Sequence, residues 1–226
     1  MRLSRLHTAW AAVELQRRAG RHAGLLLLLA AAANLVMVIT RVLADADQPT
    51  LAESLAAIAE SQVVYGMTGA ARLASGILLA GAALYLWKAW AAPLGIATLA
   101  VILLVASGAI TAVSGGCALV LAAAASGAVD DLIETVAYLR QLTGSLGFAM
   151  AGLGLVAVAL RRVQPGDPHR LFPPAALAIG IAMQFIWVDA ATLLHRIVGA
   201  AFFLWLLAAG IALERRGANR GGYPGR

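Results

Sequence analysis

A series of long apolar segments, separated by short polar ones, constrains this chain more than any other feature of its sequence. An α-helix rises about 1.5 Å per residue, so about 20 apolar residues cross the roughly 30 Å hydrocarbon core of a bilayer. We therefore predict an all-α, polytopic membrane bundle of six transmembrane helices. The predicted spans cover about residues 24–44, 62–87, 94–126, 135–160, 173–188 and 192–213.

Composition and charge restrict the class of protein further. Hydrophobic residues make up 62% of the 226 residues and charged residues only 12%, whereas soluble domains are about 45–50% apolar and about 25% charged. The net charge of +6 does not indicate nucleic-acid binding, because the basic residues lie between and beyond the apolar segments. Cys117 is the single cysteine, which excludes a disulfide within the chain, and we expect a small buried side chain there.

The distribution of charge predicts the orientation of the bundle. If the N-terminus is cytoplasmic, the 17 Lys and Arg residues fall on the cytoplasmic side except for Arg41, Arg72, Arg140 and Arg196. Most acidic residues fall on the outer side: Asp45, Asp47, Glu53, Glu60, Asp130, Asp131, Glu134 and Asp189. Cytoplasmic loops of membrane proteins are enriched in Lys and Arg. The sequence therefore predicts an even number of spans with both termini in the cytoplasm.

The chain divides into three predicted regions. In residues 1–20 apolar side chains recur at helical spacing, which predicts a cytoplasmic amphipathic helix on the membrane surface, with a partner-binding helix as the alternative. Residues 21–214 form the predicted six-helix transmembrane domain. Residues 215–226 are basic and rich in glycine, and we expect a disordered cytoplasmic tail.

Two local patterns concern helix boundaries. Thr50 and Glu53 follow Pro49 with the spacing of a capping box, so we expect a short helix to begin there, with Leu51, Leu55 and Ile58 on one face. The segment 94–126 is too long for one simple span. It forms either a single extended helix or a helix that is broken at Ser114-Gly115-Gly116.

Charged residues inside apolar segments are the main candidates for function. A charge inside a membrane costs at least about 2.5–3.5 kcal/mol, so each needs a carboxylate, a carbonyl group or water. Asn34, Val38 and Arg41 share a helix face that we expect to point into the bundle. One interpretation of these charges is an outward-facing polar pocket that could hold a small anionic or zwitterionic ligand. Its candidate residues are Arg72, Arg140, Glu134, Asp189, His195 and Arg196.

A second interpretation of the same residues is structural. The arginines could form ion pairs that hold the helices together, with Asp45, Glu60, Asp131, Glu134 and Asp189 as candidate partners. Arg41 could extend to lipid headgroups. Arg72 is the deepest of the four outer arginines and the best candidate for a role beyond anchoring.

The sequence offers little support for catalysis, metal binding or a cofactor. It lacks the G-x-S-x-G, H-E-x-x-H, P-loop and dinucleotide-binding motifs. His195 is the one histidine in an apolar span, and its spacing from Asp189 and Glu134 is unlike a zinc motif. Lys88 lies at an interface beside aromatic residues, which argues against rhodopsin-like chemistry. We therefore predict no metal, no cofactor and no enzymatic activity.

Two stretches carry a resemblance to a known family: RHAGLLLLLAAAANLVMVITRVLADADQPTLAESLAAIAESQVVYG and ARLASGILLAGAALYLWKAW. Over about residues 21–90 they resemble the first third of an uncharacterised bacterial family of six-helix membrane proteins of unknown function. The resemblance implies a six-span fold in a bacterial cytoplasmic membrane. It implies no site residues, because the family has no established catalytic residues.

Three functions remain as hypotheses at this stage. The first is a non-enzymatic accessory subunit that packs against other membrane-protein subunits through small-residue faces. Gly144, Gly147, Gly152 and the amphipathic N-terminal helix are the motivation. The second is a small-molecule binder or transporter that uses the charged outer pocket. The third, an intramembrane enzyme, ranks last.

Overall fold

The computed structural model describes residues 2–90, 95–125, 131–160, 172–188 and 192–219. Every element in these residues is a helix, which confirms the all-α class. The elements are α1 (Arg2–Ala44), α2 (Leu51–Glu60), α3 (Gln62–Trp90), α4 (Ile96–Ala124), α5 (Asp131–Leu160), α6 (Phe172–Ala182), the 3₁₀ helix η1 (Met183–Trp187) and α7 (Thr192–Asn219). The predicted disordered tail is thus helical as far as Asn219. The prediction for residues 220–226 lies outside the described residues.

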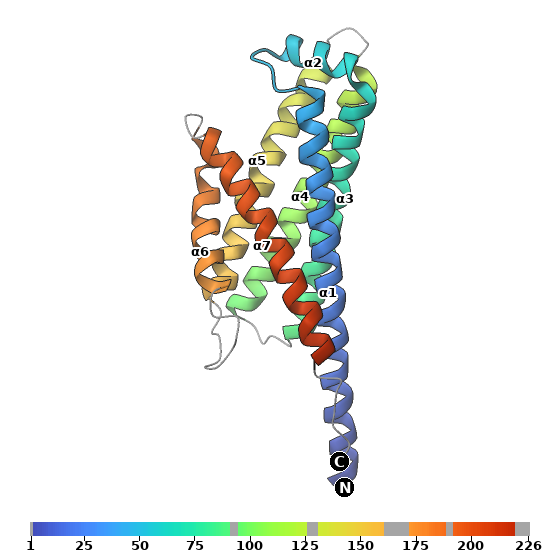
Figure 1. The fold of residues 1–226 in the computed structure, drawn as a ribbon, viewed down its shortest axis with the longest axis vertical. Coiled ribbons are helices and arrows are strands. Elements are labelled where there is room, and N and C mark those ends of the chain that lie inside the picture. The colour runs from blue at the N-terminus through green and yellow to red at the C-terminus, as the bar shows by residue number, and fades with distance from the viewer. Residues whose placement is uncertain (1, 91–94, 126–130, 161–171, 189–191, 220–226) are drawn as a thin grey trace.

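The long helices form an elongated bundle (Figure 1). α3 packs between α1 and α4, and α5 packs on α4. α6 then packs on α5, while α7 crosses α1. α2 lies across one end of the bundle, which we call the α2 end (Figure 1). At the opposite end, the first turns of α1 project beyond the other helices.

Five described helices are long and apolar enough to cross a membrane: Val13–Ala44, Gln62–Trp90, Ile96–Ala124, Asp131–Leu160 and Leu194–Arg215. The sixth predicted span corresponds to a shorter apolar segment, Pro173–Trp187, which ends in the 3₁₀ turn. Large apolar side chains are also exposed along these helices, such as Val42 (73%) and Val63 (77%). Surfaces of this kind suit lipid and not water, so the helices indicate a membrane-embedded protein.

α1 runs without interruption from Arg2 to Ala44. Its 43 residues span about 65 Å, roughly twice the thickness of the hydrocarbon core. Residues 1–20, which we expected to form a separate surface helix, therefore continue the axis of the first span from Arg2 onward. The predicted end of this span at Ala44 is confirmed.

α4 is one continuous helix, which decides between the two alternatives for residues 94–126. Gly115 does not break it. Instead, a Cβ added at Gly115 would clash with the backbone nitrogen of Leu73 and would lie 2.8 Å from the carbonyl oxygen of Gly69, both on α3. Gly76 and Gly108 meet in the same way farther along these helices. Small residues allow helix backbones to approach closely in lipid, so glycine holds α3 and α4 together.

Polar side chains inside the bundle bind across neighbouring helices. Asn34 on α1 donates to Ser75 Oγ on α3 at 2.7 Å, as predicted for a side chain that points inward. Val38 was expected on the same inward face, but its side chain is 51% exposed, so this expectation was wrong. Residues at i, i+4 and i+7 cover a wider strip of the helix surface than the strip that contacts α3. Ser107 and Ser114 on α4 donate to the carbonyl oxygens of Gly147 and Arg140 on α5 at 2.7 and 2.8 Å.

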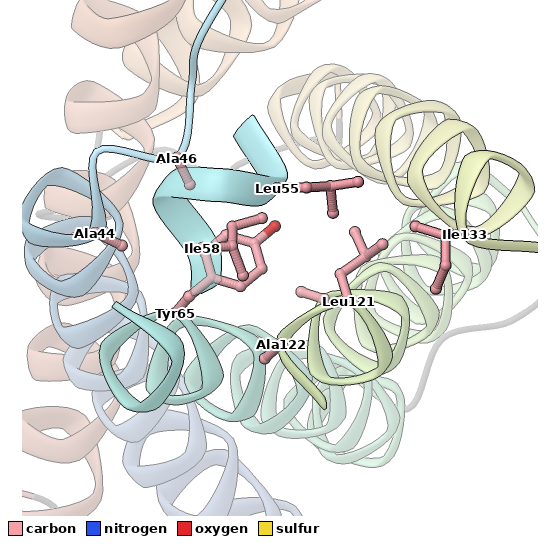
Figure 2. Close-up of a cluster of buried hydrophobic side chains, with 9 residues drawn as sticks. Ala44, Ala46, Leu55, Ile58, Tyr65, Leu121, Ala122 and Ile133 are labelled. Carbon is pink, nitrogen blue, oxygen red and sulfur yellow. The ribbon is translucent and has the colours of Figure 1, made fainter. Parts of the chain in front are cut away.

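The α2 end is closed by an apolar cluster, here called the α2 cap. It contains Ala44, Ala46, Leu55, Ile58, Tyr65, Ala118, Leu121, Ala122 and Ile133. Figure 2 shows these side chains between α2 and the ends of the surrounding helices. The predicted capping box positions α2: Thr50 Oγ1 accepts from the backbone N–H of Glu53 at 3.2 Å, and the Glu53 carboxylate accepts from the Thr50 N–H at 3.1 Å.

Candidate functional site

Four arginines gather near the α2 end, and we call them the arginine cluster: Arg41 on α1, Arg72 on α3, Arg140 on α5 and Arg196 on α7. At 1.5 Å per residue, Arg72 lies about 15 Å along α3 from Gln62, and Arg140 lies about 14 Å along α5 from Asp131. The two side chains therefore start at similar depths below the α2 cap. Their helices do not pack directly on each other, since α4 lies between them.

Arg41 is the one member with a carboxylate partner among the described residues. Its Nε donates to Asp47 Oδ2 at 2.9 Å and its Nη2 donates to Asp47 Oδ1 at 2.8 Å. This is a two-pronged pair in which both carboxylate oxygens are bound. The candidate partners predicted from the sequence did not include Asp47, which was counted only among the acidic residues on the outer side. The pairing depends on the turn after Ala44, where Asp45 adopts a positive φ of 46°.

Arg140 contacts Tyr65, a member of the α2 cap, from within the bundle. Its Nη1 donates to the hydroxyl oxygen of Tyr65 at 2.8 Å, and its guanidinium carbon lies 5.9 Å from the centre of the Tyr65 ring. Tyr65 is almost fully buried, at 1% exposure. Arg140 Nε is also buried, and it has no hydrogen-bond partner in the described part of the chain.

Arg72 crosses from α3 toward α5 and reaches the turn that follows Arg140. A Cβ added at Gly144 would lie 2.8 Å from Arg72 Nη2 and 3.4 Å from Ser114 Oγ, so glycine leaves the room that this guanidinium occupies. Arg72 Nε is buried without a hydrogen-bond partner. Within the described ranges, Arg72 forms no ion pair either.

The cluster carries more positive than negative charge. Burial alone would raise the pKa of the Asp47 carboxyl group, but the hydrogen bond and charge of Arg41 outweigh it, and the charges of Arg140 and Arg196 add to their effect. The pKa of Asp47 is therefore lowered. Arg41 and Arg140 in turn repel Arg72, which Asp47 attracts. One described carboxylate thus serves several guanidinium groups.

The other predicted pocket residues contribute less. Arg196 is exposed, and so is Glu134, which pairs with none of the cluster arginines among the described residues. His195 Nε2 lies 2.8 Å from the carbonyl oxygen of Phe185, a hydrogen bond that requires the proton on Nε2 and ties α7 to η1. The prediction for Asp189 lies outside the described residues.

The three glycines that helped to motivate an accessory subunit pack inside this chain, so they do not form a face for another subunit. Gly144 leaves room for Arg72, and a Cβ at Gly147 would lie 2.7 Å from Thr111 Oγ1 on α4. A Cβ at Gly152 would lie 2.7 Å from the carbonyl oxygen of Gly180 on α6. Sequence reading identified the small-residue faces but could not identify the helix that each one contacts.

Two residues of the site were missed. Tyr65 looked like an ordinary member of the second span, although a buried tyrosine hydroxyl usually has a hydrogen-bond partner, which was a usable signal. Ser114 was considered only for a helix break, and not for its hydrogen bond to the carbonyl oxygen of Arg140. Comparison with known proteins adds no assignment: no family model, curated protein or solved structure matches this chain.

The Arg41–Asp47 pair predicts a pH-dependent stability. A folded pKa below the unfolded value, about 3.9, means that the pair stabilises the fold above about pH 4 and that this contribution disappears as the pH falls through the folded pKa. We expect Asp47→Asn to cost about 0.2–1 kcal/mol at pH 7 because both side chains are partly exposed, and to cost less on acidification.

Thermal midpoints of the two purified proteins between pH 3 and 8 measure this difference. Glu134→Gln is the control, because it removes one acid from the same end of the bundle without removing a described ion pair. A gap between Asp47→Asn and the unmodified protein that stayed constant down to pH 3 would contradict the assignment.

Proposed function

We propose that this chain is a polytopic membrane protein that binds a small anionic or zwitterionic ligand at the arginine cluster. The observation that carries the proposal is a contrast between equivalent groups. The Nε–Nη2 edge of Arg41 holds a carboxylate, whereas the buried Nε atoms of Arg72 and Arg140 have no partner in the described residues. Buried polar groups are nearly always bonded, so these two unpartnered Nε–H groups, here called the unfilled edges, support a ligand from outside the chain.

The proposal includes the orientation in a bacterial cytoplasmic membrane. The α6–η1 segment covers about 26 Å at 1.5 Å per residue in an α-helix and 2.0 Å in a 3₁₀ helix, close to the hydrocarbon thickness. We take it as a short crossing, which makes six. α1 begins and α7 ends at the same end of the bundle (Figure 1). The excess of Lys and Arg at that end supports a cytoplasmic location for it.

Ligand binding takes precedence over the accessory-subunit function. The latter rested in part on Gly144, Gly147 and Gly152, whose contacts are made within the chain. The arginine cluster carries an unbalanced charge, and two of its buried Nε atoms, those of Arg72 and Arg140, have no hydrogen-bond partner in the described residues. We propose no chemical step, since no described acid or histidine lies within hydrogen-bond distance of the arginine cluster other than Asp47 on Arg41.

Anion-dependent thermal stability of the purified protein tests the function. A ligand that binds only the folded state raises the midpoint as its concentration increases. We expect sulfate or phosphate to raise the midpoint relative to chloride at equal ionic strength, and Arg72→Gln to abolish the increase. Arg21→Gln is the control, because it removes the same charge from an arginine that lies far from the cluster, beside Glu214 near the C-terminal end of α7. Equal midpoints in all anions would refute the proposal.

A further inference from the structure

The position of the unfilled edges specifies the class of ligand, an inference that rests on the proposed function. We propose that Arg72 and Arg140 together bind the phosphate group of a phosphomonoester, each through its Nε–Nη2 edge. The Arg140–Tyr65 bond uses Nη1, the nitrogen on the other side of the guanidinium group, and so leaves the Nε–Nη2 edge available. Arg41 shows how that edge binds two oxygens of one acid.

The number of donors favours phosphate over a carboxylate. A carboxylate has one O–C–O edge, and one side-on arginine occupies it, as Arg41 does with Asp47. A second arginine could reach only the outer lone pairs of the same two oxygens, so two side-on arginines favour an anion with more than one such edge. A phosphomonoester presents three terminal oxygens with strong acceptor capacity, and arginine forks match phosphate geometry.

Charge favours a monoester over a diester. Arg41 and Asp47 neutralise each other, so the two arginines with unfilled edges leave two positive charges. A phosphomonoester carries a charge of about −1.5 to −2 at neutral pH. A phosphodiester carries one negative charge and would leave one arginine uncompensated in a medium where unpaired charge is costly.

The surroundings of the pair support a fixed site. Ser114 binds the backbone of Arg140, and Arg72 Nη2 occupies the room that Gly144 leaves, so α4 holds the backbone at Arg140 and α5 contacts the guanidinium group of Arg72. Tyr65 holds Arg140 Nη1 from the α2 cap, which covers the pair at the end of the bundle. The phosphate can belong to a soluble metabolite or to a lipid headgroup that arrives between helices, and the experiment separates these sources.

The first experiment measures binding of soluble probes to the full-length protein in lipid-free detergent. We expect glycerol 3-phosphate to bind at least about tenfold more tightly than dimethyl phosphate, a monoanion, and than succinate, a dianion without a tetrahedral group. Arg72→Lys and Arg140→Lys keep the charge but lose the fork, and each is expected to weaken the binding of glycerol 3-phosphate by about tenfold or more. The Arg21→Lys variant is expected to bind it as the unmodified protein does.

The second experiment identifies the source by native mass spectrometry of the protein from vesicles that contain phosphatidic acid or phosphatidylglycerol. Retention of phosphatidic acid that both lysine variants lose supports a lipid headgroup. If the lysine variants lose glycerol 3-phosphate binding but the unmodified protein retains no phosphatidic acid, the result supports a soluble phosphomonoester. If one of the two lysine variants does not fold, the binding measured with the other variant tests the proposal.

Three results distinguish failure of this inference from failure of the proposed function. Succinate that binds as tightly as glycerol 3-phosphate would overturn the phosphate assignment and leave anion binding standing. Lysine variants with unchanged affinity would overturn the paired-fork geometry. Absence of binding by every anion, sulfate included, would refute the proposed function itself.

Discussion

Gly115→Ala is expected to lower the thermal midpoint of the purified protein, whereas Gly116→Ala is not. A Cβ at Gly115 would meet the Leu73 backbone nitrogen and the Gly69 carbonyl oxygen, atoms that cannot rotate away as a side chain could. Overpacking of this kind costs about 1–3 kcal/mol. For a chain of this length, the midpoint is expected to fall by about 2–12 °C.

Gly116 provides a closely matched control. It is adjacent to Gly115 in the same helix, and a Cβ added there meets nothing within 4 Å. Both substitutions give the same gain in helix propensity, so the difference between them isolates the contact of α4 with α3. Equal midpoints for the two variants would show that α3 and α4 do not approach each other through Gly115.

Arg72→Met is expected to raise the thermal midpoint when no binding anion is present. The substitution removes a guanidinium group whose Nε is buried without a partner in the described residues. An arginine in the membrane costs about 2.5–3.5 kcal/mol, and methionine keeps an unbranched side chain of similar reach. On that basis the midpoint is expected to rise by about 5 °C or more. At a saturating concentration of a binding anion, the unmodified protein is expected to have the higher thermal midpoint, because only the unmodified protein binds the anion.

Arg140→Met is the comparison for this variant. Arg140 holds the buried hydroxyl of Tyr65 at 2.8 Å, and loss of that partner leaves an unbonded buried group, at a cost of about 1–3 kcal/mol. We therefore expect its midpoint to rise less than that of Arg72→Met, or to fall. If Arg72→Met lowered the midpoint as much as Arg140→Met does, Arg72 would have a structural partner in the folded protein, and the proposed ligand site would lose its support.

Local sequence was sufficient for the features that depend on neighbouring residues. The capping box at Thr50 and Glu53 forms within one helical turn, so its geometry follows from spacing. The same holds for the end of α1 at Ala44. The position of the four outer arginines in apolar segments also followed from the sequence, because the free-energy cost of an intramembrane charge depends on the residue itself.

Tertiary structure decided every feature that depends on which helix faces which. Composition cannot tell whether Gly115 breaks a helix or accommodates a neighbouring backbone, because glycine suits both. Nor could spacing reveal that Asp47 reaches back to Arg41 while Arg72 finds no carboxylate in the described residues. Charge pairing and close packing depend on distances of a few ångströms between segments far apart in sequence, and those distances are set by how the helices pack.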